Sequence, residues 1–313
     1  MNGRGHVSRY RPRQRRNKIL PLIVFISIIV LALLALFIVL GNYFNDRSQN
    51  QPPAVTPSES EREAPKAAPP SVRCYVLDIE GEAASQTNNN LSKLASSGAR
   101  AVSVNVRGSD STLLYSSNVA KSFGKQSGGY IEMSTIASRA DSRAMYLSAY
   151  LRLEFMSEKN SDVRAAKLGY EAALVSEMCS AGADDVVVYA PDAAADNYTE
   201  LVRLAENVKA ANPTANIGVA LKKDIFLLPN SALIIDELYK VYDILCIDLT
   251  EIKINDIEDA LESAVGSNLY YILRYNTRVI LPDISDAELL KKVNDSLSAN
   301  SVSNIQFVKI KQN

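Results

Sequence analysis

Short apolar runs rich in β-branched residues alternate with helical stretches from Val72 to Asn313. Runs of this kind, bounded by polar or turn residues, are typical of buried β-strands. They predict eight strands, at Val72–Ile79, Arg100–Arg107, Met145–Leu153, Asp184–Ala190, Ala215–Leu221, Tyr242–Leu249, Asn268–Tyr275 and Asn304–Ile310.

Helical stretches separate the predicted strands. We expect helices at Asn89–Ser97, Tyr130–Ala140, Val163–Ser180, Asn197–Ala211, Ser231–Lys240, Asp256–Val265 and Asp286–Leu297. Two of them have capping residues at the start: Asn255 precedes Asp256, and Ser285 stands three residues before Glu288, which is the spacing of a capping box.

The alternation of strands and helices predicts the fold class. Eight strands with crossover helices in roughly 240 residues match a closed (β/α)8 barrel, the TIM-barrel architecture, whose typical size is about 250 residues. A doubly wound open sheet is the alternative, and it would carry a Gly-rich phosphate loop after its first strand. This chain has the sequence DIEGE at residues 78–82 instead, so the pattern favours the barrel.

The connection Gly108–Gly129 is long for a loop between a strand and a helix, and it is rich in Ser and Gly. Such a segment suits either a mobile lid over the barrel mouth or a tolerated insertion. The sequence leaves both interpretations open.

A long apolar run, Ile19–Leu40, precedes the barrel and contains only Pro21 and Ser27 as interruptions. About 22 residues form a helix roughly 33 Å long, which is enough to cross the hydrocarbon core of a bilayer. The alternative is a cleaved signal peptide, whose apolar region has about 7 to 15 residues and ends at a small-residue cleavage site. No such site follows Leu40, so we expect an uncleaved single-pass anchor with the lipid bilayer as its partner.

The flanks of this run predict its orientation. Residues 1–18 carry seven basic residues and no acidic one, so the positive-inside rule places this tail in the cytoplasm and the rest of the chain outside. Residues 41–71 are rich in Pro, Ala, Ser, Gln and Glu, a composition that buries too little apolar surface to offset the entropy of ordering. They predict a disordered stalk that holds residues 72–313 away from the membrane, toward a partner in the cell envelope.

The charge balance bears on the partners of the outer domain. The whole chain has 34 basic and 35 acidic residues, and removing the seven of the tail leaves 27 basic residues, a net charge of about −8. Affinity for nucleic acid depends mainly on cationic contacts to phosphates. The outer domain is therefore not expected to bind nucleic acid.

Charged and polar residues stand where the predicted strands end, which is where a (β/α)8 barrel places its ligand-handling groups. The acids are Asp78, Glu80, Glu154, Asp192, Asp248 and Glu251; the bases are Arg107, Arg152, Lys222, Lys223 and Arg274; the polar residues are Asn105, Tyr189 and Tyr275. Any one of them alone is more simply a solvated rim charge or half of an ion pair. Six acids among several arginines indicate a site more strongly.

Histidine and cysteine usage narrows the chemistry. The sole histidine, His6, lies in the predicted cytoplasmic tail, which excludes a Ser-His-Asp triad, a Cys-His dyad and a histidine-ligated zinc site in the outer domain. Cys74, Cys179 and Cys246 are isolated and have no C-x-x-C spacing, so we interpret them as buried small hydrophobes. We expect no metal and no cofactor. What remains is carboxylate chemistry of the kind used in glycoside hydrolysis.

The segment Ala101–Tyr115, AVSVNVRGSDSTLLY, resembles the second-strand motif AVVIDVKDDxGxLxY of bacterial glycoside-hydrolase-like barrels of the DUF4015 type. Tyr146–Phe155 resembles the third strand of that family, and Gly169–Pro191 resembles its segment EAxxxGFDEIxxDYVRFP. Tyr242–Asp248 stands where the family has a strand beginning VDY. The resemblance covers most of residues 72–250 and implies a (β/α)8 barrel that acts on polysaccharide.

Acids are missing at positions where the family has them. Asn105 replaces the strand-two Asp, Arg107 replaces the following Lys, and the fourth strand ends in Tyr189 rather than in a carboxylate. An amide cannot serve as a general acid or base. The chain also has no tryptophan, so tyrosines would have to supply the flat surfaces that sugar-binding clefts commonly use.

Three functions are compatible with these observations. The first is a degenerate barrel that binds envelope polysaccharide or a protein partner through Asp78, Asn105, Arg107, Tyr189, Arg274 and Tyr275. The second is an active glycosidase with relocated acids, for which Glu154, Asp248 and Glu251 are the catalytic candidates. The third is a non-catalytic envelope scaffold. Two carboxylates that face one cleft would favour a glycosidase, whereas acids locked in ion pairs would favour a binding or scaffolding module.

Overall fold

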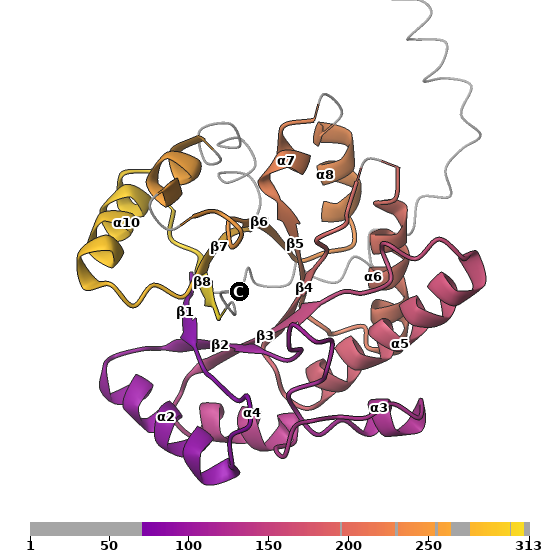
Figure 1. Cartoon of the computed structure of the whole chain (residues 1–313), viewed down its shortest axis with the longest axis horizontal. Coiled ribbons are helices and arrows are strands. Elements are labelled where there is room, and N and C mark those ends of the chain that lie inside the picture. Colours follow the sequence, from indigo (N-terminus) through magenta and orange to yellow (C-terminus); the bar gives the residue numbers. More distant parts are fainter. Residues whose placement is uncertain are drawn as a thin grey trace, which may run out of the picture. The chain divides into compact units, whose positions relative to one another are not determined.

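A closed barrel of eight parallel strands forms the centre of the described structure (Figure 1). The computed structural model describes residues 71–194, 196–228, 231–253, 256–263, 276–300 and 302–309. The strands are β1 (Arg73–Val76), β2 (Ala101–Asn105), β3 (Tyr146–Arg152), β4 (Asp185–Tyr189), β5 (Ile217–Lys222), β6 (Ile244–Asp248), β7 (Thr277–Pro282) and β8 (Ile305–Val308). Each strand pairs with its neighbours in the chain, and β8 closes the barrel against β1. This topology confirms the predicted (β/α)8 barrel and excludes the open sheet.

Helices surround the barrel (Figure 1). They are α2 (Ala84–Ser96), α3 (Asn118–Ser122), α4 (Met133–Asp141), α5 (Ser161–Ser180), α6 (Thr199–Ala211), α7 (Lys223–Phe226), α8 (Ser231–Tyr239) and α10 (Ala287–Ala299), and residues 257–263 are also helical. The short helices α3 and α7 were not predicted, because four or five residues are too few to show helical periodicity.

One strand differs from the prediction. The strand between β6 and β8 is Thr277–Pro282, whereas the run Asn268–Tyr275 predicted for this place lies outside the described residues. The sequence TRVILP does not predict a buried strand, because it contains Arg278 and ends in a proline. Arg278 nevertheless lies inside the barrel, where it is 2% exposed.

Side-chain caps fix the starts of three described helices, α3, α5 and α10, and at α3 the Ser117 hydroxyl accepts from the Ala120 amide. At α10 the cap is Asp286, whose carboxylate accepts a hydrogen bond of 2.9 Å from the Leu289 amide, so the predicted cap Ser285 is one residue too early. At α5 the Asn160 side chain accepts hydrogen bonds from the amides of Asp162 and Val163. The other predicted cap, Asn255, lies outside the described residues.

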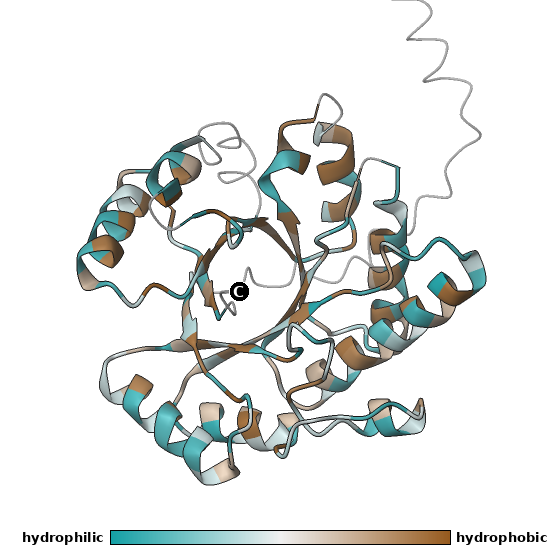
Figure 2. Cartoon of the chain, in the orientation of Figure 1, coloured by the Kyte–Doolittle hydropathy of each residue, from teal (hydrophilic) through white to brown (hydrophobic). Residues whose placement is uncertain are grey.

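Three apolar clusters hold the barrel together, the smallest of which is made of Val72, Cys74 and Ala101. The largest lies between the strands and the surrounding helices, and the strands appear largely hydrophobic while the helices carry polar residues (Figure 2). The third is made of Tyr150, Val187, Tyr189, Ala220, Ile244, Cys246, Ile280 and Val308. The thiols of Cys74 and Cys246 are free, and burial raises the pKa of each to about 12. This confirms both as buried small hydrophobes, while Cys179 is only partly buried.

A buried ion pair lies among the amino-terminal halves of the strands. The Arg278 guanidinium is 2.7 Å from the carboxylate of Asp185 and donates a second hydrogen bond of 2.7 Å to Gln306. Asp185 also accepts hydrogen bonds from the hydroxyls of Tyr146 and Ser148. Because so many partners satisfy both charges, this end of the barrel interior tolerates an arginine and an aspartate that are 2% and 0% exposed.

The connection between β2 and α4 is anchored to α5 through one carboxylate. Glu177 accepts hydrogen bonds from the hydroxyls of Tyr115 (2.8 Å) and Ser117 (2.6 Å). It also accepts from the amides of Asn118 (2.7 Å) and Val119 (3.1 Å). Tyr115 and Ser117 are buried. These contacts fit an anchored insertion better than a mobile lid.

The predicted anchor Ile19–Leu40, the basic tail and the stalk lie outside the described residues and stay predictions. Among the helices that the structure does describe, none combines the length and the apolar character that crossing a membrane would require.

Candidate functional site

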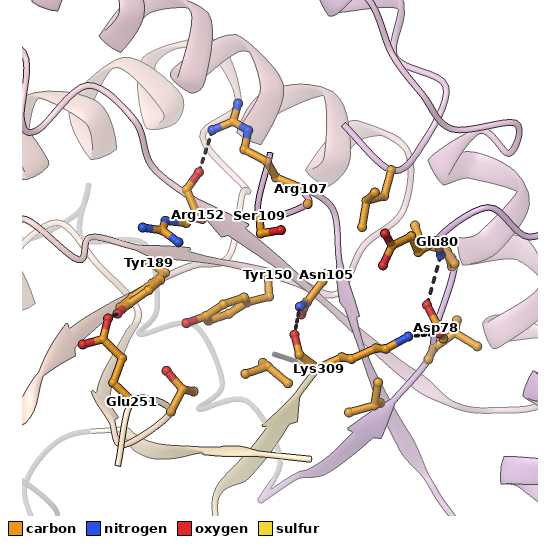
Figure 3. A pocket seen from close by; sticks show the side chains of 17 residues that line it. Asp78, Glu80, Asn105, Arg107, Ser109, Tyr150, Arg152, Tyr189, Glu251 and Lys309 are labelled. Carbon is orange, nitrogen blue, oxygen red and sulfur yellow. Dashed lines mark hydrogen bonds and ion pairs between the residues drawn. The ribbon is translucent and has the colours of Figure 1, made fainter. Parts of the chain in front are cut away.

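A cavity of about 250 Å³ lies at the carboxyl ends of the strands, the end at which (β/α)8 barrels carry their sites (Figure 3). Its apolar wall comes mainly from β1, β8 and the β1–α2 connection. Its polar lining consists of Asp78, Glu80, Asn105, Arg107, Ser109, Tyr150, Arg152, Tyr189, Thr250, Glu251 and Lys309. The cavity is thus mixed, with acids, bases, hydroxyls and one amide.

The side of the cavity near β1 and β8 is organised around Lys309. The Lys309 ammonium forms an ion pair with Asp78, and the other carboxylate oxygen of Asp78 accepts from the Glu80 amide at 3.1 Å. The Asn105 amide group donates a hydrogen bond of 2.6 Å to the Lys309 carbonyl. The Asn105 Oδ1 atom is buried and has no hydrogen-bond partner within the described part of the chain.

The opposite side of the cavity is organised around Glu251. The Lys222 ammonium is 2.8 Å from Glu251 Oε2, and the Tyr189 hydroxyl donates to Oε1 at 3.1 Å (Figure 3). The hydrogen bond from Lys222 lowers the pKa of Glu251, and the Tyr189 hydroxyl and the Arg152 charge act in the same direction. Glu251 is therefore an ionised carboxylate held in a fixed orientation.

Asp248, at the end of β6, has the opposite electrostatic character. It is 4% exposed, and burial raises its pKa to about 6, although the Thr250 amide donates a hydrogen bond of 3.1 Å to Oδ1. Its Oδ2 atom is buried without a hydrogen-bond partner among the described residues. Asp248 is outside the cavity lining. Its negative charge raises the pKa values of Tyr189 and Tyr150, and only burial contributes more to these shifts.

Tyr150 and Tyr189 form a stacked aromatic pair in the cavity wall. Their ring centroids are 5.7 Å apart and their planes differ by 20°. Both side chains are buried, and the Tyr150 hydroxyl has no hydrogen-bond partner in the part of the chain that the structure describes. Figure 3 shows this hydroxyl directed toward the side of the cavity that carries Glu251.

Arg107 lines the cavity, but its charge is used elsewhere. Its Nη1 atom donates to Glu171 of α5 at 2.8 Å and to the Arg152 carbonyl at 2.6 Å, and its side chain is 2% exposed. Glu154 lies 3.9 Å from Arg107 Nε and is outside the cavity lining. The structure therefore places Arg107 and Glu154 in one ion-pair network between the barrel mouth and α5.

The predicted site residues divide into groups by location. Asp78, Asn105, Arg107, Tyr189 and Glu251 line one cavity, Asp248 lies beside it, and Glu154 and Asp192 are outside its lining. Arg274 and Tyr275 lie outside the described residues. Sequence reasoning missed Tyr150 and Lys309. Tyr150 and Arg152 are two residues apart and therefore lie on the same face of β3. This spacing is the sequence signal that could have identified Tyr150 as a site residue.

Similarity searches inform the fold. No protein-family model matches the sequence, and no match was found among curated proteins. Solved structures do match. A candidate α-L-fucosidase from Bacteroides thetaiotaomicron VPI-5482 has a TM-score of 0.52 at 10% identity, over 80% of this chain and 91% of its own. A family 5 glycoside hydrolase from Bacteroides vulgatus ATCC 8482 has a TM-score of 0.50 at 12% identity, over 76% of this chain and 59% of its own.

The chain has the TIM-barrel fold. At these identities the likeness extends to the barrel and not to its chemistry, because the same fold carries many unrelated activities. The function of this TIM barrel therefore depends on the residues of its own cavity.

Proposed function

We propose that this protein binds a polysaccharide of the cell envelope in the cavity at the barrel mouth. The observation that carries the proposal is that two of the three buried polar atoms of the cavity lining that lack hydrogen-bond partners within the described residues, Asn105 Oδ1 and the Tyr150 hydroxyl, belong to uncharged side chains. A buried polar atom without a partner costs about 1 to 3 kcal/mol. Sugar hydroxyls both donate and accept hydrogen bonds, so a sugar satisfies an amide oxygen and a phenol together.

The acids around the cavity support binding more than hydrolysis. Asp78 is paired with Lys309, Glu251 with Lys222, and Glu154 with Arg107. A carboxylate neutralised by a cation is a weak proton donor and a weak nucleophile. The stacked tyrosines offer an apolar surface of the kind on which sugar rings pack, in a chain that has no tryptophan.

The proposal includes a location. The basic tail, the apolar run Ile19–Leu40 and the Pro-rich stretch 41–71 would place the barrel outside the membrane on a stalk. An extended stalk of about 30 residues reaches roughly 90 Å, at about 3.1 Å per residue. A barrel held on such a stalk could reach a polysaccharide that is fixed in the envelope.

The test is binding of the full chain, solubilised in nonionic detergent, to purified bacterial envelope polysaccharides. We expect Asn105→Ala and Tyr150→Phe each to weaken binding by up to about tenfold, because each removes a hydrogen bond worth about 0.5 to 1.5 kcal/mol. Asn89→Ala and Tyr130→Phe make the same chemical changes at exposed positions away from the cavity and should bind like wild type. Unchanged binding in both cavity variants would contradict the assignment of the site.

A second function, glycoside hydrolysis, is favoured by one observation. Burial raises the pKa of Asp248 to about 6, whereas Lys222 lowers the pKa of Glu251, and carboxyl groups whose pKa values are pushed apart are typical of an acid and base pair. The Tyr189 hydroxyl donates a hydrogen bond to Glu251, and the Tyr189 ring stacks on Tyr150. Tyr189 therefore connects this acid to the aromatic pair in the cavity wall.

Hydrolysis is tested with a set of chromogenic aryl glycosides. If Asp248 donates a proton, Asp248→Asn and Glu251→Gln should each lower turnover by about 10² to 10⁴. The wild-type rate should fall as the pH rises through about 6, where Asp248 loses its proton. Glu154→Gln, outside the cavity lining, is the control and should keep most of the rate. Wild-type rates in the Asp248 and Glu251 variants, or no turnover at all, would exclude this second function.

A further inference from the structure

One cation in the cavity wall lacks a carboxylate partner. Arg152 ends β3 at the barrel mouth, where its side chain is exposed and lines the cavity (Figure 3). No carboxylate in the described residues lies within ion-pair distance of its guanidinium. Its backbone carbonyl accepts from Arg107, which fixes the strand end that carries the side chain.

The other two cations that line the cavity already have carboxylate partners. Arg107 is 2.8 Å from Glu171, and Lys309 is paired with Asp78. Lys222, next to the cavity, is 2.8 Å from Glu251. Among the described cations that line the cavity, Arg152 is thus the one without an ion pair, and its charge acts on Glu251 only from beyond ion-pair distance. An incoming anion would meet it without having to displace an internal partner.

The surroundings of Arg152 fit a sugar that carries a carboxylate. The Tyr150 hydroxyl, which has no hydrogen-bond partner in the described structure, is two residues away on the same face of β3, and the stacked Tyr189 lies on the adjacent strand β4. The carboxylate of Glu251 is neutralised by Lys222, which limits its repulsion of an anion. Glu80 lies on the far side of the cavity from Arg152 (Figure 3). A guanidinium binds a carboxylate through two parallel hydrogen bonds, a geometry that a lysine cannot provide.

We infer that the cavity takes an acidic sugar, a uronic acid unit of a polysaccharide, whose carboxylate binds Arg152 while its hydroxyls bind Asn105 and Tyr150. This inference rests on the proposed function and adds the class of sugar. It assigns Arg152 as the residue that selects acidic over neutral polymers.

The experiment compares polyuronates with their own carboxyl-reduced forms. Polygalacturonate, polyglucuronate and polymannuronate are each tested beside the neutral polymer obtained by reducing their carboxyl groups, with the full chain in nonionic detergent. A charge-assisted hydrogen bond is worth about 1.5 to 3 kcal/mol, so wild type should bind at least one acidic polymer about tenfold to a hundredfold more tightly than its reduced form. Added salt should weaken this preference.

Variants of Arg152 test the assignment of the residue. Arg152→Gln should abolish the preference while leaving weak binding of the reduced polymer, and Arg152→Lys should restore only part of it because the charge remains without the planar fork. Arg100→Gln makes the same change at an exposed arginine beside the amino-terminal end of β2, and it should behave like wild type.

Three outcomes would overturn the inference, and they can be distinguished. Equal binding of acidic and reduced polymers by wild type, or a preference that survives in Arg152→Gln, would remove the acidic class but leave polysaccharide binding intact. Failure to bind any of these polymers would also overturn it. The proposed function would then be tested separately, by the binding of wild type and of the Asn105 and Tyr150 variants to other envelope polysaccharides.

Discussion

Replacing Arg278 with methionine is expected to lower the free energy of unfolding by about 3 to 5 kcal/mol. The substitution preserves most of the side-chain volume but leaves the Asp185 carboxylate, which is fully buried, without its cation. Urea unfolding monitored by tyrosine fluorescence and circular dichroism measures the change. Lys240→Met, which removes a cation from a surface pair with Glu237, is the control and should leave the unfolding midpoint unchanged.

A second substitution separates the lost charge from lost packing. Adding Asp185→Asn to Arg278→Met removes the uncompensated negative charge, so it should recover part of the lost stability. If Arg278→Met alone costs less than about 1 kcal/mol, the ion pair is not the main stabilising contact in this part of the barrel.

Replacing Asp248 with asparagine is expected to stabilise the protein above pH 7. The pKa of Asp248 is about 6 in the folded chain, whereas an unfolded aspartate has a pKa near 3.9. The folded state therefore holds the proton more tightly, and this contribution to stability is complete below about pH 4 and is lost as the pH rises through about 6. A shift of about two units corresponds to a loss on the order of 3 kcal/mol.

The measurement is the free energy of unfolding of wild type and Asp248→Asn from pH 4 to pH 8. The difference between them should grow in favour of the variant through this range, because asparagine cannot ionise. Asp295→Asn, an exposed carboxylate on α10, provides the control for general effects of charge. Parallel pH curves for wild type and Asp248→Asn would show that Asp248 ionises at an ordinary pKa and has no special environment.

These two predictions contrast the two ends of the barrel interior. At the amino-terminal end, the charges of Arg278 and Asp185 are paired with each other, although Arg278 Nε has no hydrogen-bond partner among the described residues, and substitution should destabilise. At the carboxyl-terminal end, Asn105, Tyr150 and Asp248 keep atoms without partners in the described chain, and substitution of Asp248 should stabilise. Residues that lower the stability of the folded protein are typical of functional sites, and here they lie at the carboxyl-terminal end of the barrel.

The fold could be predicted because parallel barrel strands are buried on both faces and leave continuous apolar runs in the sequence. The prediction was wrong for β7 because this strand does not form a continuous apolar run. β7 contains the charged residue Arg278, which pairs in the structure with Asp185 of β4. That partner is distant in the chain, and no local pattern connects the two residues.

The site could be predicted only in part, because strand ends show which residues reach the mouth but not where their side chains point. Asn105 is the last residue of β2 and lines the cavity with its amide. By strand alternation Arg107 should point the same way, but β2 has ended and its guanidinium turns to Glu171 of α5. Glu154 lies two residues beyond β3 and joins the same network.

Helix α5 carries two acidic side chains that hold different parts of one wall. Glu171 fixes Arg107, and Glu177 fixes the segment around Tyr115 and Ser117 that follows it. The cavity wall formed by Arg107, Gly108, Ser109 and Leu114 is therefore braced from outside the barrel. A displacement of α5 would therefore act on this wall through both Glu171 and Glu177, which links the position of one outer helix to the shape of the cavity.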